Sequence, residues 1–367
     1  MDSSKYKKSS TFLTIFRLLQ LFLFLYLFLF SIDLMGTALK LFGKGFAETL
    51  ISTTSNPMVG LFIGMLSTAI IQSSSSTTSI VVGMVGGGVL TVHNAIPIVM
   101  GANIGTTVTN ILVSLAHINR SHEFRRSFAA STVHDIFNVL SVICFFPLQY
   151  FTNFLGIAST ALGNVFQDIG GLKLFNPIKA ITKPVVHILV DFARQYPWIL
   201  LTLSIILLFI ALANLVRNLR VLIVKRAEEW FNKILFKNML RAFIIGLLLT
   251  VLVQSSSITT SLIVPLAGAG ILRLEQIFPY TLGANLGTTV TAILASLITA
   301  NANAVIVAFA HLLFNVSGTI IWWPLNKIPI AIARKFSDFA IRNKLIPIGY
   351  IILAFFILPI LIITLFR

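Results

Sequence analysis

Apolar stretches, each about the length of a membrane-spanning helix, alternate with short polar connections along the chain. A helix needs about 20 apolar residues to cross a bilayer. Seven stretches come close to this length, at residues 12–34, 95–116, 127–148, 197–216, 277–299, 304–325 and 346–366. The pattern predicts an all-α integral membrane protein. Its first stretch is longer than the apolar part of a signal peptide, which has about 7 to 15 residues, so we expect a retained helix.

Two further apolar regions are interrupted by a block of hydroxyl and amide side chains. Residues 58–71 are apolar, the block from Gln72 to Thr78 follows, and apolar residues then continue to the glycines at 86–88. Neither arm is long enough to span a bilayer alone, and serines weaken helix interiors because they compete for backbone hydrogen bonds. The pattern therefore predicts a re-entrant helical hairpin that breaks at the polar block, and residues 238–270 predict a second one.

The two hairpins belong to an internal duplication. Gln254 follows Gln72 by 182 residues, and the motif Gly-Ala-Asn-Ile-Gly-Thr-Thr at Gly101 returns, with one change, at Gly283, again 182 residues later. Over residues 72–115 and 254–297, 24 of 44 positions are identical without a gap, against roughly one in fifteen expected from average residue usage. A fixed offset of this kind indicates two copies of one structural unit.

Each copy contains three full crossings and one hairpin. An odd number of crossings predicts that the second copy enters the membrane from the opposite side, as an inverted-topology pair. We expect repeat 1 at 1–150, with a hairpin at about 57–90, a broken helix at 95–116 and a helix at 127–148. We expect repeat 2 at 197–326, with a hairpin at about 238–270, a broken helix at 277–299 and a helix at 304–325.

The remaining segments link or follow the repeats. Residues 151–196 are expected to form an external connector with amphipathic pieces such as Ile178 to Phe192. A peripheral helix is our first interpretation of this connector, and a disordered linker is the second. Residues 327–367 are expected to form a cytoplasmic link and a final transmembrane helix.

Composition and charge support the membrane class and give an orientation. The chain is 57% hydrophobic and only 10% charged, which leaves too little polar surface for a soluble globule of this size. In a soluble protein, a net charge of +16 would suggest binding to nucleic acid. Here, however, 20 of the 27 basic residues fall on one predicted side of the membrane. Cytoplasmic loops of membrane proteins carry excess Lys and Arg, so this bias is a topology signal. We therefore expect a plasma (inner) membrane protein without a nucleic-acid partner. Its N-terminus is expected to be cytoplasmic and its C-terminus outside.

The polar blocks are candidate ligand sites. They contain hydroxyls and amides but no Lys or Arg, so an oxyanion there would be held by neutral donors and by the amides of the half-helices that begin after each break. Cations bound alongside would neutralise its charge. The competing interpretation is that Ser, Thr and Gly only allow close helix packing, but two polar blocks at one offset favour a binding site.

A third candidate lies in the helix predicted at 127–148. Thr132, Asp135 and Asn138 are spaced at i, i+3 and i+6 and share a helix face. A carboxylate in a membrane span is costly and by default marks an ion site, so we expect Asp135 to bind a cation. Repeat 2 has Leu312 at the corresponding position, and for His134 we favour a packing role.

These motifs resemble the type II sodium/phosphate cotransporter family. The resemblance rests on both Gln-Ser-Ser-Ser blocks, on Gly-Ala-Asn-x-Gly-Thr-Thr after each block, and on the run from Arg125 to Asn138 (Arg-Arg-x-Phe-Ala-x-x-Thr-Val-His-Asp-x-Phe-Asn). It covers roughly residues 56–150 and 238–325. It implies an elevator-like transporter with a phosphate cradle at the two blocks. The cradle residues are Gln72, Ser73, Ser74, Ser75, Thr77, Thr78, Gln254, Ser255, Ser256, Ser257, Thr259 and Thr260.

The resemblance also implies sodium sites. The residues that it implies as sodium ligands are Thr132, Asp135, Asn285, Thr288 and Thr291. We add the neighbouring oxygen-bearing side chains as candidate ligands: Asn103, Thr106, Thr107, Asn138 and Thr289.

The function we expect is sodium-coupled transport of inorganic phosphate, with sodium as the coupling ion and no cofactor. A symporter for another oxyanion, such as sulfate or a dicarboxylate, is the nearest alternative. An intramembrane hydrolase that uses a serine with His134 and Asp135 is remote, because adjacent residues on a helix point about 100° apart. We expect a chain that is not an enzyme, with phosphate, sodium and the lipid bilayer as partners, and the sequence leaves a homodimer open.

Overall fold

Every regular element in the described part of the chain is helical. The computed structural model describes residues 3–168, 176–231 and 238–366. Seven helical segments among them are long and apolar enough to cross a membrane: Leu19–Leu41, Val92–Leu115, Ser121–Thr152, Pro197–Asn214, Leu274–Thr299, Ala302–Trp322 and Leu345–Phe366. Each overlaps one of the seven predicted spans, which confirms the prediction of an all-α membrane protein.

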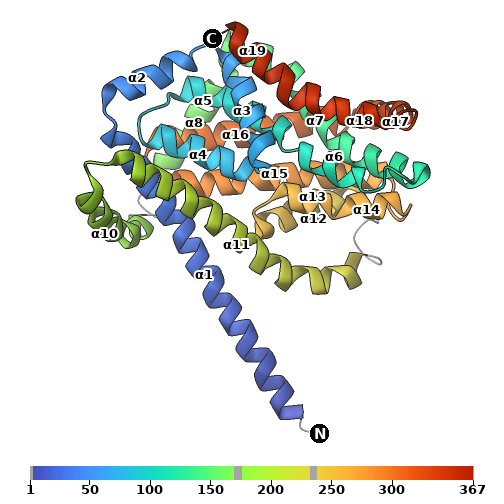
Figure 1. Ribbon diagram of the computed structural model, residues 1–367, viewed down its shortest axis with the longest axis horizontal. Coiled ribbons are helices and arrows are strands. Elements are labelled where there is room, and N and C mark those ends of the chain that lie inside the picture. The colour runs from blue at the N-terminus through green and yellow to red at the C-terminus, as the bar shows by residue number, and fades with distance from the viewer. Residues whose placement is uncertain (1–2, 169–175, 232–237, 367) are drawn as a thin grey trace.

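Repeat 1 and the connector contain the first nine labelled helices (Figure 1). Their bounds are α1 Ser3–Leu41, α2 Lys44–Thr53, α3 Pro57–Ile71, α4 Ser74–Gly86, α5 Val92–Gly105, α6 Val108–Leu115, α7 Ser121–Thr152, α8 Phe154–Asp168 and α10 Asn176–Ala193. Helix α2 meets α3 at 95°, because Asn56 caps α3 and Pro57 occupies its first position, where its fixed φ favours a helix start. The N-terminal half of α1 projects away from the other helices in Figure 1.

The second half of the chain forms the remaining helices. Their bounds are α11 Pro197–Phe231, α12 Met239–Val253, α13 Ser256–Ser261, α14 Ile263–Gly268, α15 Leu274–Thr299, α16 Ala302–Trp322, α17 Lys327–Ala340, α18 Leu345–Ile352 and α19 Leu358–Phe366, with one π-helical segment, Leu353–Ile357, between the last two. Helix α11 packs along α1 at one flank of the molecule (Figure 1).

Glycines bring equivalent helices of the two repeats equally close together. A Cβ atom on Gly101 in α5 would run into the carbonyl oxygen of Leu61 in α3, and one on Gly283 in α15 would run into that of Phe243 in α12. Both glycines and both contacted residues are related by the 182-residue offset. Small residues allow membrane helices to pack backbone against backbone. The duplication is thus visible in packing as well as in sequence.

The connector contributes two helices. Its amphipathic part lies in α10, which packs on α1, while α8 packs on α16. Residues 169–175 lie outside the described residues. At the other end of the chain, the carbonyl oxygen of Phe366 accepts a hydrogen bond from Asn56 Nδ2 at 3.3 Å. The end of α19 therefore lies beside the start of α3, close to the C label in Figure 1.

One sequence expectation is wrong. We predicted a broken helix at 277–299, but α15 runs without interruption from Leu274 to Thr299, whereas its counterpart is divided into α5 and α6 at Thr106–Thr107. Thr107 Oγ1 lies 2.7 Å from the carboxylate of Asp135. Repeat 2 has Leu312 in place of this acceptor, and Thr289 donates only to Leu286 O of its own helix, at 2.7 Å.

Candidate functional site at the paired hairpin tips

Both hairpins break at the glutamine of the polar block. Gln72 ends α3 with φ 57° and ψ 26°, and Gln254 ends α12 with φ 56° and ψ 25°. A residue other than glycine in this left-handed region costs about 1–3 kcal/mol and persists only where its surroundings enforce it. The next residue caps the following helix in each case: Ser73 Oγ accepts from Ser76 N at 3.2 Å, and Ser255 Oγ from Ile258 N at 3.4 Å. The two tips therefore share one strained backbone design.

The two tips meet each other. Ser75 Oγ in hairpin 1 donates to the carbonyl oxygen of Gln254 in hairpin 2 at 3.0 Å. The Gln254 side chain is held in turn, because its Oε1 accepts from Thr291 Oγ1 at 2.6 Å and its Nε2 donates to Val251 O at 2.6 Å. The Gln72 side chain is exposed, and no hydrogen bond fixes it among the described residues. The tips are thus adjacent, but their glutamines differ.

Four threonines of the predicted phosphate set use their protons inside their own helices. Thr77, Thr78, Thr259 and Thr260 donate to the carbonyls of Ser73, Ser74, Ser255 and Ser256 at 3.2, 2.8, 2.9 and 2.7 Å. A hydroxyl that donates in this way presents only lone pairs to a ligand. In this conformation these threonines suit a cation or a donor group better than an oxyanion.

The serines provide donors without a protein acceptor. Ser74 and Ser256 are repeat equivalents, both are buried, and neither hydroxyl donates to another described residue. Ser256 Oγ is also shielded from solvent. A buried polar group without a partner is uncommon and calls for an explanation. A ligand with acceptor oxygens is one explanation, and these two serines are where it would be held.

Asp135 is fully buried in α7 and receives two hydroxyl donors. Thr107 Oγ1 donates to Oδ1 at 2.7 Å, and the Tyr350 hydroxyl of α18 donates to Oδ2. None of the four salt bridges between described residues involves Asp135. Thr132, predicted as its co-ligand, instead donates to Phe128 O at 2.8 Å. The carboxylate therefore has hydrogen bonds but no compensating positive charge.

A network of histidine and asparagine side chains joins the two repeats. His134 Nε2 donates to Asn285 Oδ1 at 3.2 Å, and His311 Nε2 donates to Asn103 Oδ1 at 3.2 Å. Each pair links one repeat to the other, and the two pairs are repeat equivalents. Because the amide oxygens accept, both rings carry the proton on Nε2. The packing role favoured for His134 thus takes the form of a cross-repeat hydrogen bond.

Amide groups complete this network. Asn285 Nδ2 donates to Asn138 Oδ1 at 3.0 Å and to Asn315 Oδ1 at 2.9 Å, and Asn103 Nδ2 donates to Asn315 Oδ1 at 3.2 Å. All these side chains are buried. Buried networks rigidify a core when every member is satisfied. The predicted sodium ligands Asn103, Asn138 and Asn285 therefore lie together, at the centre of the contact between repeats.

The predicted threonine ligands divide into three groups. Thr288 and Thr289 donate within α15, at 3.2 and 2.7 Å, as Thr132 does within α7. Thr107 and Thr291 donate across the core, to Asp135 and Gln254. Thr106 Oγ1 is buried and has no partner among the described residues, which leaves both its proton and its lone pairs for a ligand.

Several polar residues of the core were missed by the sequence analysis. Tyr350 lies in the final helix outside the repeats and carried no repeat signal. Thr109, whose Oγ1 is buried without a partner, is the repeat equivalent of Thr291 and could have been found by the offset. Asp33 is buried in α1 and accepts from Thr182 Oγ1 at 2.8 Å. As a carboxylate in an apolar stretch, it gave the same signal as Asp135.

Asn110 was also missed, and it makes the core asymmetric. Asn110 Nδ2 lies 2.8 Å from Thr260 Oγ1 and 3.5 Å from His134 Nδ1. Its repeat equivalent is Ala292, and accordingly His311 Nδ1 is buried without a partner. Two sequence differences, Asn110 against Ala292 and Asp135 against Leu312, thus give the first half of the core polar groups that the second half lacks.

The fold and this core define a multi-pass helical membrane protein in which two broken helical segments meet at buried polar side chains. The model of the Na+/Pi-cotransporter family matches residues 27–174 and 207–334. The chain belongs to this family.

Named relatives are consistent with that assignment. The chain is 31% identical to sodium-dependent phosphate transport protein 2B of Homo sapiens, over 90% of this chain and 62% of that protein. It is also 31% identical to sodium-dependent phosphate transport protein 2A of Rattus norvegicus, over 90% of this chain and 64% of that protein. The chain thus spans about three fifths of the length of these curated relatives. No solved structure matches it significantly.

Proposed function

We propose that this protein moves inorganic phosphate across the membrane together with sodium. The observation that carries the proposal is the contact between two repeat-related helix breaks in a core that also contains a buried carboxylate, Asp135, without a basic partner among the described residues. The family assignment and the names of its relatives support the same substrates.

Phosphate would be held at the tips by neutral donors. Ser74 and Ser256 have unused hydroxyl protons, and α4 is a 13-residue helix whose N-terminus lies in the polar block of repeat 1. Helix N-termini favour anions through their free N–H groups and the helix dipole. No lysine or arginine is part of either block, so the negative charge of the anion is compensated only if cations bind nearby.

Sodium would supply the compensating positive charge. Asp135 in α7 accepts a hydrogen bond from Thr107, and the buried hydroxyl oxygens of Thr106 and Thr109, close to Thr107 in the chain, have no partner among the described residues. Hydroxyl, amide and carboxylate oxygens are suitable ligands for a small hard cation. We infer that sodium binds first and completes the phosphate site, so neither ion binds tightly without the other.

The topology we propose is an inverted pair of repeats in the plasma (inner) membrane. Three candidate spans in each repeat and the cross-repeat hydrogen bonds of His134 with Asn285 and of His311 with Asn103 support it. The hydrogen bond between Asn56 and Phe366 supports a C-terminus on the same side as the hairpin 1 entrance, which the charge pattern assigns to the outside. An elevator-like movement of the hairpins and a homodimer remain predictions.

We also propose that the protein has no catalytic activity. His134 and Asp135 have separate partners, Asn285 on one side and Thr107 with Tyr350 on the other. They do not form the hydrogen-bonded pair of base and orienting acid that a serine hydrolase needs.

Uptake into proteoliposomes tests the function. Radiolabelled phosphate should accumulate under an inward sodium gradient and not under a matched potassium gradient. Equal uptake under both gradients would contradict coupling to sodium. Excess unlabelled sulfate or succinate should leave the uptake unchanged, and strong inhibition by either would favour the alternative oxyanion substrates.

A further inference from the structure

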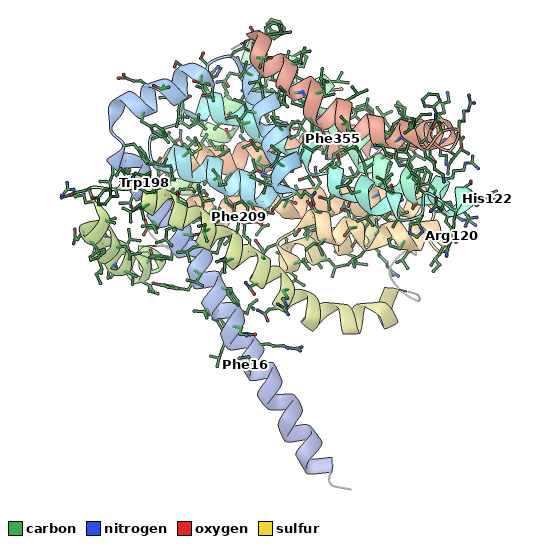
Figure 2. The ribbon with its side chains drawn as sticks, in the orientation of Figure 1. Phe16, Arg120, His122, Trp198, Phe209 and Phe355 are labelled. Carbon is green, nitrogen blue, oxygen red and sulfur yellow. The ribbon has the colours of Figure 1, made fainter. Side chains whose placement is uncertain are left out.

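A group of charged residues, separate from the hairpin tips, surrounds a cavity of about 650 Å³ at one end of the molecule. Its lining includes Arg125, Arg126, Arg273, Arg334, His122 and, as its one acidic residue, Glu275. These residues come from α7, from the start of α15 and from α17. Figure 2 shows His122 at this end of the molecule, where α7 begins.

The cavity lies where helices begin, at one edge of the expected membrane region. No residue of either hairpin tip lines it. Candidate spans begin at Ser121 and Leu274, and the cavity is lined by the first residues of both helices. The positive ends of two long helix dipoles therefore add to the charge of the arginines. The position places the cavity where either water or lipid headgroups can reach it.

Two of the arginines are already paired, but only weakly. Arg125 pairs with Asp338, and Arg334 Nη2 lies 2.5 Å from Glu275 Oε1. Both arginine side chains are 54% exposed, and the acids are 44% and 46% exposed. Exposed ion pairs contribute about 0–1 kcal/mol. An arriving anion can therefore compete with these carboxylates.

The other two arginines, Arg126 and Arg273, have no acidic partner among the described residues. Arg126 reaches across to repeat 2, because a Cβ on Gly270 would clash with its guanidinium group. Gly270 has φ +78°, a left-handed conformation that glycine adopts without strain. The turn between α14 and α15 thus brings the Arg126 guanidinium group against its backbone, at the edge of a cavity that has surplus positive charge.

We propose that this cavity is a second anion site, specific for a phosphate group, that binds without sodium. Guanidinium groups match phosphate oxygens with paired N–H donors, and here the arginines themselves neutralise the anion. The site is therefore chemically opposite to the hairpin tips, which have neutral donors and need cations. The phosphate group can belong to free inorganic phosphate or to a lipid with a phosphomonoester headgroup.

The test uses the full chain in lipid nanodiscs and sodium-free choline chloride buffer, so that it does not depend on sodium-coupled transport. In one arm, inorganic phosphate is titrated by calorimetry into phosphatidylcholine nanodiscs. In the other arm, retention of phosphatidic acid is measured by native mass spectrometry. Binding in the first arm identifies free phosphate as the ligand, and binding in the second identifies a headgroup.

Five variants make the result specific. Arg126→Gln and Arg273→Gln should each weaken binding about 10-fold or more, because each removes a hydrogen bond to a charged group. Arg126→Lys should have an intermediate effect, since it keeps the charge and loses the paired donors. Arg120→Gln is the matched control, because Arg120 is 74% exposed, pairs with Glu123 and does not line the cavity. Ser256→Ala should leave this sodium-free binding unchanged.

The proposal is overturned if neither arm shows binding. It is also overturned if Arg120→Gln weakens binding as much as Arg126→Gln, which would indicate a general effect of surface charge. Loss of binding in Ser256→Ala would locate the anion at the hairpin tips instead. Thermal unfolding of each variant checks that the substitutions, all at exposed arginines or at one small serine, leave the fold intact.

Discussion

The hydroxyl of Tyr350 donates a hydrogen bond to the carboxylate of Asp135 from a helix that lies outside both repeats. Asp135 has no counterpart in repeat 2, and Tyr350 comes from α18, which has no copy in the duplication. Of the seven candidate spans among the described residues, the duplication accounts for six, and the carboxylate that we assign to sodium accepts its hydrogen bond from the seventh.

This relationship predicts the behaviour of Tyr350→Phe. The variant loses a hydrogen bond to a charged group, worth about 1.5–3 kcal/mol, so the sodium-free protein should unfold at a lower temperature. Sodium should restore much of this stability, because the cation then compensates the carboxylate. Thermal unfolding in sodium and in choline chloride measures the difference. An equal loss of stability in both salts would mean that Tyr350 has only a packing role.

Asp135→Asn tests the sodium site directly. The substitution keeps the size and one oxygen but removes the charge, so sodium affinity should fall while phosphate affinity at saturating sodium is largely kept. At low sodium, apparent phosphate affinity should drop, because each ligand changes the affinity of the other by the same factor. A sodium titration of phosphate binding provides the measurement.

The double variant Asp135→Asn with Leu312→Asp tests whether a carboxylate in repeat 2 can replace the one that was removed. The added carboxylate would lie in repeat 2, where α15 is continuous and Thr289 donates within its own helix. Sodium affinity should therefore not recover. A wild-type sodium midpoint in the folded Asp135→Asn protein would return Asp135 to a structural role.

Ser74→Ala and Ser256→Ala test the phosphate cradle. Each removes a hydroxyl without a protein acceptor, and the loss of one hydrogen bond to a charged ligand costs about 1.5–3 kcal/mol, or roughly 10-fold to 150-fold in affinity. Ser261→Ala is the matched control, since its hydroxyl donates to Ile258 O of its own helix at 2.9 Å. Phosphate binding at saturating sodium should separate the three. If both tip variants bind like the control, phosphate is held elsewhere.

Cysteine labelling tests the inverted arrangement. Asn56 and Asn238 are the N-caps of α3 and α12, the equivalent first arms of the two hairpins. Cysteines at these positions should react with an impermeant reagent from opposite sides of the membrane. The background is Cys144→Ala, because the native cysteine is exposed. Each cap replacement costs about 1 kcal/mol, and labelling of both sites from one side would remove the inverted model.

The sequence predicted the features that depend on local chemistry. The breaks at Gln72 and Gln254 follow from runs of serine inside apolar arms that are too short to span a bilayer, and the seven spans follow from hydropathy. The continuity of α15 was not predictable in this way. At this point Thr107 has the carboxylate of Asp135 as a second acceptor beside Ile104 O, whereas Thr289 has Leu286 O alone. The residue that makes this difference, Leu312, lies on a different helix from Thr289.

The partners of the site residues were also beyond the reach of periodicity. The helical spacing places Thr132, Asp135 and Asn138 on one face, yet Thr132 bonds within α7, Asp135 bonds to Thr107 and Tyr350, and Asn138 joins the asparagine network. A shared face fixes only the direction in which side chains point. The neighbouring helices, packed from distant parts of the chain, decide which partner each side chain meets.

The paired bonds from His134 to Asn285 and from His311 to Asn103 have a consequence for the origin of the molecule. A protein with only one copy of the repeat would leave its own histidine and asparagine unpaired in the membrane. In the inverted arrangement that we propose, it would satisfy them by associating with a second copy of itself that faces the other way. Gene fusion would have made that association permanent and freed each half to change alone. The acid at position 135 and the amide at position 110 are differences that an association of two identical chains could not have.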